Sequence, residues 1–299
     1  MAEMRQSERD EARWYDAYYF QHGCGQPYER NTVWLQFFDG IAQKIVEVIG
    51  PRTALDAGCA MGFLVERLRA RGVEAFGVDL SAYAISQAHE SVRPYCWVGS
   101  VIDPFPQRYD LIVCIEVLEH LRQPASEAAI ANLCRFSDDI LFSSTPFDYR
   151  EATHFNVQPP EYWADQFARH GFVRDVDCDA SFITPWAVRF RRTREPLHRI
   201  VRNYERHFWL LWKENTDLRR LTVEMRDQLA SGEQAWQAQR LSQAQEIQAL
   251  QQRLEAVGQE LHMRNLQWLD ITRRPSWKFV QWLHRLRQRL MPPGTWREQ

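Results

Sequence analysis

Short apolar runs alternate with amphipathic segments over the first two thirds of the chain. The runs have the length of buried strands and lie at residues 53–55, 73–78, 95–100, 109–115, 140–146, 171–173 and 187–190. Between them, apolar residues recur every three or four positions, as in residues 63–68, which is typical of helices that bury one face. This alternation predicts an α/β domain over residues 51–195. A polar leader and an amphipathic helix from about Asn31 to Ile49 occupy residues 1–50.

The pattern changes after the α/β domain. Residues 200–263 are rich in glutamine and charged residues and contain no proline. Apolar residues recur here at steps of three and four in two blocks, and the phase slips near Gly232. The first block comprises Tyr204, Phe208, Leu211, Leu218, Met225 and Leu229, and the second comprises Ile247, Leu250, Leu254, Val257 and Leu261. This spacing predicts a coiled coil over residues 196–263 that joins chains into a homo-oligomer. A single helix packed back on the domain is the alternative.

Residues 264–299 form a basic amphipathic tail. No acidic residue lies between Asp270 and Glu298, whereas the same stretch contains Arg273, Arg274, Lys278, Arg285, Arg287, Arg289 and Arg297. An apolar stripe at helical spacing consists of Trp277, Val280, Leu283, Leu286 and Leu290. A basic helix with an apolar face suits an anionic membrane surface, so we expect peripheral membrane contact. Packing on a protein partner or on the domain is the alternative.

The remainder of the chain is acidic. Residues 1–270 contain 38 acidic and 30 basic residues, which gives them a formal charge of −8. Nucleic-acid binding depends on basic surface that neutralises phosphates. We therefore do not expect nucleic acid as a partner.

One turn in the α/β domain has the residues of a nucleotide-binding loop. The sequence Leu-Asp-Ala-Gly-Cys-Ala-Met-Gly occupies residues 55–62, and Asp79 ends the next apolar run. Glycine permits positive φ and lets a ligand approach the backbone. An acid at the end of the second strand is placed to hydrogen-bond a ribose. The spacing D-x-G-x-A-x-G differs from the G-x-G-x-x-G of dinucleotide-binding loops.

This turn resembles motif I of the class I S-adenosylmethionine (SAM) methyltransferases, and residues 109–121 resemble their motif IV. The resemblance covers about residues 25–192. It implies a Rossmann-like seven-stranded sheet with SAM as the cofactor, and a leader that folds over the cofactor as a lid. The cofactor contacts that it implies are Asp56, Gly58, Cys59, Ala60, Gly62, Asp79, Leu80, Ser100, Cys114 and Ile115, with Arg30 from the leader.

Acids and histidines cluster after two of the expected strands. Glu116, Glu119 and His120 follow the fourth strand, and His154 follows the fifth. Carboxylates and imidazoles together bind divalent cations such as Mg²⁺, Mn²⁺ or Zn²⁺. The pattern resembles the small-RNA 2′-O-methyltransferases and the ubiquinone-pathway O-methyltransferases, which implies that these four residues are metal ligands. The same pattern occurs in methyltransferases without a metal, where His120 or His154, assisted by Glu119, would act as the general base.

The segment His-Phe-Asn-Val-Gln-Pro-Pro-Glu-Tyr-Trp, residues 154–163, resembles methyltransferases of bacterial surface-polysaccharide gene clusters. That resemblance implies O-methylation of a sugar or glycan hydroxyl, with Tyr162 and Trp163 as candidates for stacking on a sugar face. Two alternatives remain open. One is O-methylation of a small catechol-like molecule or an RNA ribose, and the other is a non-catalytic scaffold with a SAM-binding fold.

Composition bears on the location of the protein. The six cysteines lack metal-finger spacing, and the N-terminus is polar and charged. We therefore expect reduced thiols, no signal peptide and a cytoplasmic protein, peripheral at the inner membrane if the tail binds lipid. No stretch approaches the roughly 18 apolar residues of a membrane-spanning helix.

Overall fold

The computed structural model describes residues 11–290, so the start of the polar leader and the end of the tail, with Arg297, lie outside the described part. The chain divides into two compact units, of which the first ends at Trp209 and the second begins at Leu210. The boundaries expected at residues 50 and 195 fall in loops. The boundary expected at residue 263 falls inside a continuous helix, α8 (Leu197–Arg273).

The first unit is built on a seven-stranded sheet with the order β3-β2-β1-β4-β5-β7-β6. The strands are β1 (Thr53–Ala57), β2 (Glu74–Asp79), β3 (Cys96–Val98), β4 (Leu111–Ile115), β5 (Asp139–Ser143), β6 (Phe172–Arg174) and β7 (Val188–Arg192). Strands β1 to β5 pair in parallel, and β7 is antiparallel to both β5 and β6. This is the Rossmann-like seven-stranded sheet that the sequence predicted, and the expected fold class is confirmed.

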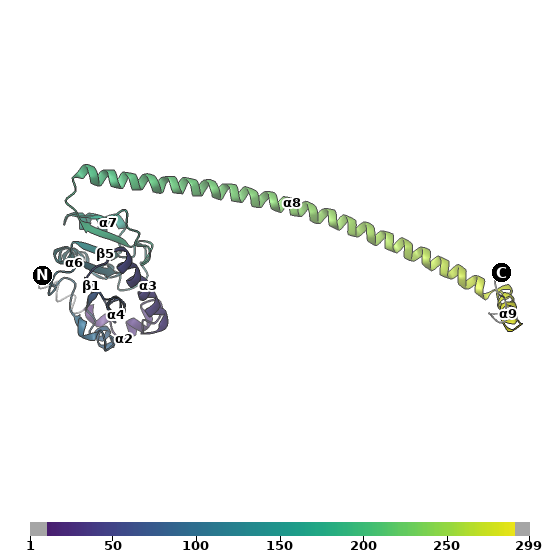
Figure 1. The fold of residues 1–299 in the computed structure, drawn as a ribbon, viewed down its shortest axis with the longest axis horizontal. Helices are drawn as coiled ribbons and strands as arrows, with labels where there is room; N and C mark the ends of the chain where they lie inside the picture. Colours follow the sequence, from purple (N-terminus) through teal and green to yellow (C-terminus); the bar gives the residue numbers. More distant parts are fainter. Residues whose placement is uncertain (1–10, 291–299) are drawn as a thin grey trace, which may run out of the picture. The chain divides into compact units, whose positions relative to one another are not determined.

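Helices cover both faces of the sheet (Figure 1). One layer contains α3 (Thr32–Val48), α4 (Phe63–Ala70) and α5 (Ala82–Gln87), and the other contains α6 (Gln123–Phe136) and α7 (Pro160–Ala168). Successive strand residues point to opposite faces. Leu55 and Ile112 accordingly pack under α6 and α7, whereas Val113 packs under α3 and α4.

The leader packs against the glycine turn. Its elements are η1 (Ala12–Trp14) and α2 (Ala17–His22), and the Asp16 carboxylate caps α2 by accepting from Tyr18 N at 2.9 Å. Phe20 on α2 is buried with Met61 and Phe63, at the start of α4. Residues far apart in the sequence therefore form one small apolar cluster beside the turn that follows β1.

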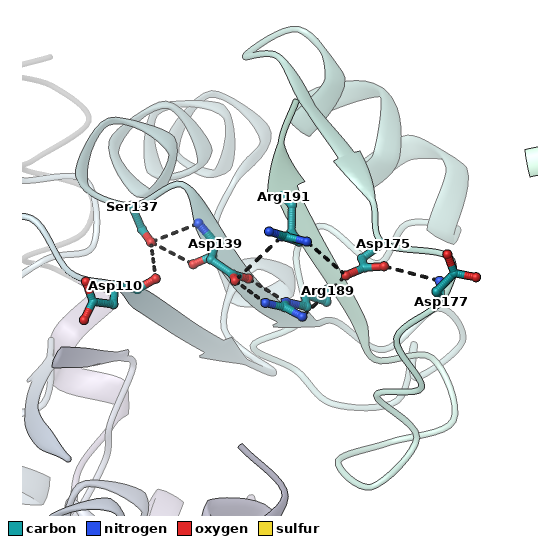
Figure 2. A network of polar contacts seen from close by, with 7 residues as sticks. All are labelled: Asp110, Ser137, Asp139, Asp175, Asp177, Arg189 and Arg191. Atoms are coloured by element: carbon teal, nitrogen blue, oxygen red, sulfur yellow. Dashed lines mark hydrogen bonds and ion pairs between the residues drawn. The ribbon is translucent and has the colours of Figure 1, made fainter. Parts of the chain in front are cut away.

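A polar network joins β5 to the antiparallel strands (Figure 2). Arg189 on β7 donates through Nε to Asp139 Oδ1 at 2.8 Å, and its Nη1 lies 3.4 Å from Asp175 Oδ2. The Arg189 and Asp139 side chains are only 11% and 15% exposed. Asp139 begins β5, so the network lies at the amino ends of the parallel strands. The loops that could bind a ligand follow the opposite, carboxyl ends of these strands.

The second unit consists of most of α8 and of α9 (Pro275–Leu290). Helix α8 runs without interruption through Gly232, where the sequence pattern slips, and none of its residues is buried. The rings of Trp268 and Trp277 pack 5.5 Å apart across the junction of the two helices. Within residues 11–290, no helix combines the length and the apolar character needed to cross a bilayer.

Candidate functional site

The turn after β1 has an unusual backbone. Gly58, Ala60 and Gly62 adopt positive φ angles of 92°, 46° and 74°. A Cβ atom on Gly58 would lie 2.2 Å from Val117 Cγ2, so only glycine fits there without movement of a neighbour. The turn leads directly into α4, with Gly62 as its N-cap residue. The two glycines leave the backbone of this turn open to close approach by a nucleoside cofactor.

Asp79 lies beside this turn at the end of β2. Its Oδ2 accepts from Ala60 N at 2.7 Å, and its Oδ1 accepts from Ser81 N at 2.8 Å. Each carboxylate oxygen keeps a further lone pair for a ribose hydroxyl. Burial raises the pKa of Asp79, although the two N–H donors act in the opposite direction. The turn and this acid together fit SAM.

Asp56, at the end of β1, is also buried. Burial, reinforced by the charge of Asp79, raises its pKa to about 8. Two acids therefore lie side by side at the carboxyl ends of β1 and β2. A cationic ligand such as SAM would compensate for their burial, because an opposite charge favours the ionised form of a carboxyl group.

The other predicted cofactor contacts are placed as follows. Cys59 and Cys114 are buried in the core, Leu80 and Ile115 are half-buried, and Ser100 Oγ accepts from Ile102 N at 3.1 Å. Arg30 pairs with Glu66 on α4, at 2.8 Å between Nη2 and Oε1, and its contact with the cofactor stays a prediction. This contact anchors the leader to α4. Tyr28 lies beside it and stacks on Phe63, with ring centroids 5.0 Å apart.

The turn after β4 begins with a second backbone outlier. Glu116 has a positive φ of 52°. This conformation is rare for a residue with a side chain, and residues that adopt it cluster at functional sites. Its Oε1 accepts from Trp186 Nε1 at 2.9 Å. Glu119, in η3 (Leu118–His120), is fully buried and accepts from Thr145 N at 3.2 Å. Burial and the nearby Glu116 raise the pKa of Glu119 well above its usual range.

Two main-chain hydrogen bonds bring the loop after β5 against η3. Phe155 N and Asn156 N both donate to the Glu119 carbonyl oxygen, at 2.8 and 2.9 Å. As a result the rings of His120 and His154 lie 4.6 Å apart. Burial lowers the pKa of His120 to about 4, although the nearby Glu151 acts in the opposite direction. His120 is therefore a neutral imidazole near pH 7.

Glu151 completes this cluster. Within residues 11–290, one group of at least three His, Cys, Asp or Glu side chains has all its ligand atoms within 4.8 Å of one another. It consists of His120, Glu151 and His154. His154 Nδ1 lies 2.8 Å from the Asp148 carbonyl oxygen and must donate to it, which leaves Nε2 without a proton in the neutral ring. That Nε2 lies 3.2 Å from Glu151 Oε2. A proton or a metal ion placed between these two atoms would bind to both of them.

The second histidine is oriented in the same way. Thr153 donates its hydroxyl proton to Glu151 Oε1 at 2.6 Å and so accepts from His120 Nδ1 at 3.0 Å. The Nε2 of His120 is thereby left as the basic nitrogen. Tyr19 of the leader also donates to Glu151 Oε1, at 3.0 Å. The leader is thus hydrogen-bonded directly to the cluster, which we call the His120–Glu151–His154 cluster.

The sequence predicted the two histidines but not Glu151. A signal existed, since Glu151 precedes His154 by three residues, but an acid in a polar loop is common. Glu116 and Glu119, which the resemblance implies as metal ligands, lie outside the set of ligand atoms within 4.8 Å of one another. Their role as ligands stays a prediction.

The aromatic residues near the site differ from those expected. Trp163 is only 2% exposed and packs on Phe142, so it cannot stack on a sugar and the expectation is wrong for this residue, whereas it stays a prediction for the half-buried Tyr162. Large exposed rings instead flank the cluster in sequence. Phe147 and Tyr149, in the loop after β5, are 64% and 71% exposed, and Trp14 of the leader packs on Phe155, next to His154.

The sheet order, the glycine turn and the acid at the end of β2 are features of class I methyltransferase domains, whose cofactor is SAM. Residues 34–175 match a family described as "Methyltransferase domain". The chain is 31% identical over 153 residues to the ubiquinone biosynthesis O-methyltransferase of Saccharophagus degradans, covering 48% of this chain and 61% of that one. It is 34% identical over 102 residues to the protein of the same name from Methylococcus capsulatus, covering 31% and 43%.

Among solved structures, the magnesium protoporphyrin IX methyltransferase from Synechocystis PCC 6803 with bound SAM matches with a TM-score of 0.48 at 17% identity. That match covers 62% of this chain and 98% of the other. The chain spans at most about three fifths of the curated relatives named above.

Proposed function

We propose that the protein transfers the methyl group of SAM to a hydroxyl of a sugar or glycan in polysaccharide biosynthesis. The observation that carries the O-methylation is the His120–Glu151–His154 cluster. It follows β4 and β5 at the sheet edge where β1 ends in the glycine turn and β2 in Asp79. A ligand-binding site at the carboxyl ends of parallel strands is the rule for such sheets.

A hydroxyl acceptor requires what this cluster supplies. In the transfer, the acceptor oxygen forms a bond to the methyl carbon while the bond from sulfur to that carbon breaks. The hydroxyl proton must leave, and S-adenosylhomocysteine departs as a neutral thioether. His120 is neutral near pH 7, with its Nε2 free, and is therefore the general base of this proposal. Glu151 and Thr153 hold the ring in the orientation that exposes Nε2.

A divalent cation fits the same cluster. Two imidazoles and one carboxylate form a donor set that suits Mn²⁺, Fe²⁺ or Zn²⁺. His154 donates its other ring nitrogen to a backbone carbonyl, as metal-binding histidines commonly do. When bound, such an ion would supply a Lewis acid that lowers the pKa of a coordinated hydroxyl.

Calorimetry with Mn²⁺ and with Zn²⁺ tests the cation directly. We expect saturable binding to the wild type and a loss of at least tenfold in affinity for Glu151→Gln and for His154→Asn. His170→Asn, a surface histidine outside the cluster, is the matched control. Equal affinities in all four proteins would dismiss the cation and leave His120 as an unassisted base.

Two features support a glycan as the acceptor. The exposed rings of Phe147 and Tyr149 border the loop that carries Glu151, and aromatic faces suit the C–H surface of a sugar. The long helix α8 and the basic helix α9 also fit an enzyme that works on a lipid-linked acceptor at a membrane. A catechol-like acceptor is the second candidate, because the curated relatives reported above are ubiquinone biosynthesis O-methyltransferases.

Transfer of labelled methyl from SAM into a fractionated bacterial extract tests the function. We expect label in the lipid-linked glycan pool, and none with the Asp79→Ala variant, which should bind SAM more weakly. Label confined to the small-molecule pool would establish the catechol candidate, and label in RNA would contradict both. Absence of SAM binding at millimolar concentration would contradict an enzymatic role and favour a scaffold.

A further inference from the structure

Helix α8 exposes an apolar face beyond its first turns, where Tyr204 Oη accepts from Arg174 N at 3.2 Å. None of its residues is buried. Four leucines of the apolar face are each more than half exposed, namely Leu211, Leu218, Leu250 and Leu254. Isolated helices are marginal in water, and helical stability normally comes from burying one face. Helix α8 therefore needs a partner along most of its length.

The apolar residues of α8 follow a heptad. With Val201 and Phe208 at a positions, the a and d positions continue through Tyr204, Leu211, Leu218, Met225 and Leu229. One a position in this block is polar and is occupied by Asn215, and another is Thr222. A buried asparagine at an a position specifies register and number of strands, since each copy can satisfy its amide only against the other.

Charges beside this asparagine select the direction of pairing. Glu214 occupies the g position before Asn215, and Arg219 occupies the following e position. In a parallel in-register pair, the g residue of one helix meets the next e residue of its partner. Glu214 would then face Arg219 of the second copy, on both sides of the seam. Within residues 11–290 neither side chain has an intrachain ion pair, so both are available for this contact.

We propose that α8 pairs with α8 of a second copy as a parallel, in-register two-stranded coiled coil. The phase slip near Gly232 fits this arrangement. From Leu229 to Ile247 the seam follows steps of 3, 4, 4, 3 and 4 residues, through Gly232 and Trp236 and then through two polar positions, Arg240 and Gln243. One extra four-residue step is a stutter, which unwinds the supercoil locally without breaking the helices.

Solution mass and cysteine crosslinking test this proposal on the full chain. Light scattering should give twice the chain mass of 35.5 kDa. Under a mild oxidant, Leu218→Cys should form an interchain disulfide in high yield, because d positions face each other in a parallel pair. Lys213→Cys, on the outer face, is the matched control and should crosslink at least tenfold less. A monomer, or equal crosslinking of both variants, would overturn the proposal, as would a trimeric mass.

A second inference rests on α9 alone. At 100° per residue, Phe279, Leu283, Leu286 and Leu290 share one face, and all are exposed. Lys278, Arg285 and Arg289 follow one border of this face, Arg287 follows the other, and α9 contains no acid. The geometry points to an anionic lipid bilayer as the partner of α9, since lipid tails suit the face and acidic headgroups suit its borders.

Sedimentation with vesicles tests this second inference. The full-length protein should bind vesicles that contain phosphatidylglycerol and leave pure phosphatidylcholine vesicles unbound. Leu286→Asp should weaken the binding at least tenfold, whereas Gln281→Asp, which adds the same charge on the polar face, should weaken it far less. Equal binding to neutral vesicles, equal affinities of the two variants, or binding to neither type of vesicle would overturn the inference.

Discussion

Gly58 holds the turn after β1 in a conformation that a side chain would disturb in two ways. Its φ is 92°, and a Cβ would lie 2.2 Å from Val117 Cγ2. We expect Gly58→Ala to lower the free energy of unfolding by about 2–3 kcal/mol or more, and to weaken SAM binding at least tenfold. Calorimetry and chemical denaturation measure the two effects.

Gly72 provides the matched control for this prediction. Its φ is 83°, but a Cβ there would meet no atom within 4 Å. Gly72→Ala should therefore cost only the backbone strain, about 1–2 kcal/mol, and leave SAM affinity unchanged. If both variants lost the same stability and the same affinity, the contact with Val117 would have no part in shaping the turn.

Asp56 predicts a pH dependence of stability in the absence of ligand. Its carboxyl group has a pKa of about 8 in the folded protein, because it is buried and lies near Asp79, against an ordinary value of 3.8. Between these values the folded state holds a proton that the unfolded state has lost, so unfolding releases a proton and stability falls as pH rises. The slope from this group reaches about 1.4 kcal/mol per pH unit.

Denaturant titrations at several pH values between 5 and 8 measure this slope. Asp56→Asn keeps the shape of the side chain and removes its titration, so the fall in stability with rising pH should be clearly shallower. Glu90→Gln, an exposed acid, should leave the slope as it is in the wild type. The same slope in all three proteins would show that Asp56 ionises normally when folded.

At the scale of elements, the Arg189–Asp139 pair fixes the antiparallel strands to the parallel sheet (Figure 2). Arg189→Ala would leave the mostly buried Asp139 without its main partner. We expect a loss of about 3 kcal/mol, which corresponds to roughly 6–12 °C in Tm for a domain of this size. Arg191→Ala removes a side chain that is 57% exposed and should cost less than about 1 kcal/mol. Thermal unfolding followed by circular dichroism compares the two, and equal shifts would contradict the distinction.

The elements themselves were predictable because their patterns are local. The helix expected from Asn31 to Ile49 is observed as α3, with Asn31 as its cap. The contacts between elements were not predictable in this way. Glu151 reaches the two histidines only because the loop after β5 folds back and bonds to the Glu119 carbonyl, which no spacing in the sequence records. Arg30 similarly meets Glu66 because the leader lies beside α4, an ion pair that the sequence did not predict, and its contact with SAM stays a prediction.

At the scale of the whole molecule, the proposed pairing of α8 and the proposed membrane contact of α9 depend on residues that are exposed in a single chain. The α8 heptad was readable from sequence because a seam repeats along one helix. The proposed direction of pairing rests on Asn215, Glu214 and Arg219, whose positions in the heptad would set register and charge pairing between two copies. Since α9 follows α8 directly, a parallel pair places both copies of α9 at the same end of the coiled coil. The oligomer would then present two basic apolar faces to one membrane.

Pairing should therefore raise membrane affinity without any new lipid contact. When one α9 is bound, the second acts at a high effective concentration, which commonly adds a factor of 10² or more. We expect Leu218→Glu, which places charges against each other in the seam, to give a monomer that binds anionic vesicles at least tenfold more weakly at equal chain concentration. Thr216→Glu adds the same charge outside the seam and should stay dimeric with nearly unchanged binding. A monomeric Leu218→Glu protein that bound vesicles as tightly as the wild type would show that each α9 acts alone, because the lipid-binding helix is identical in both.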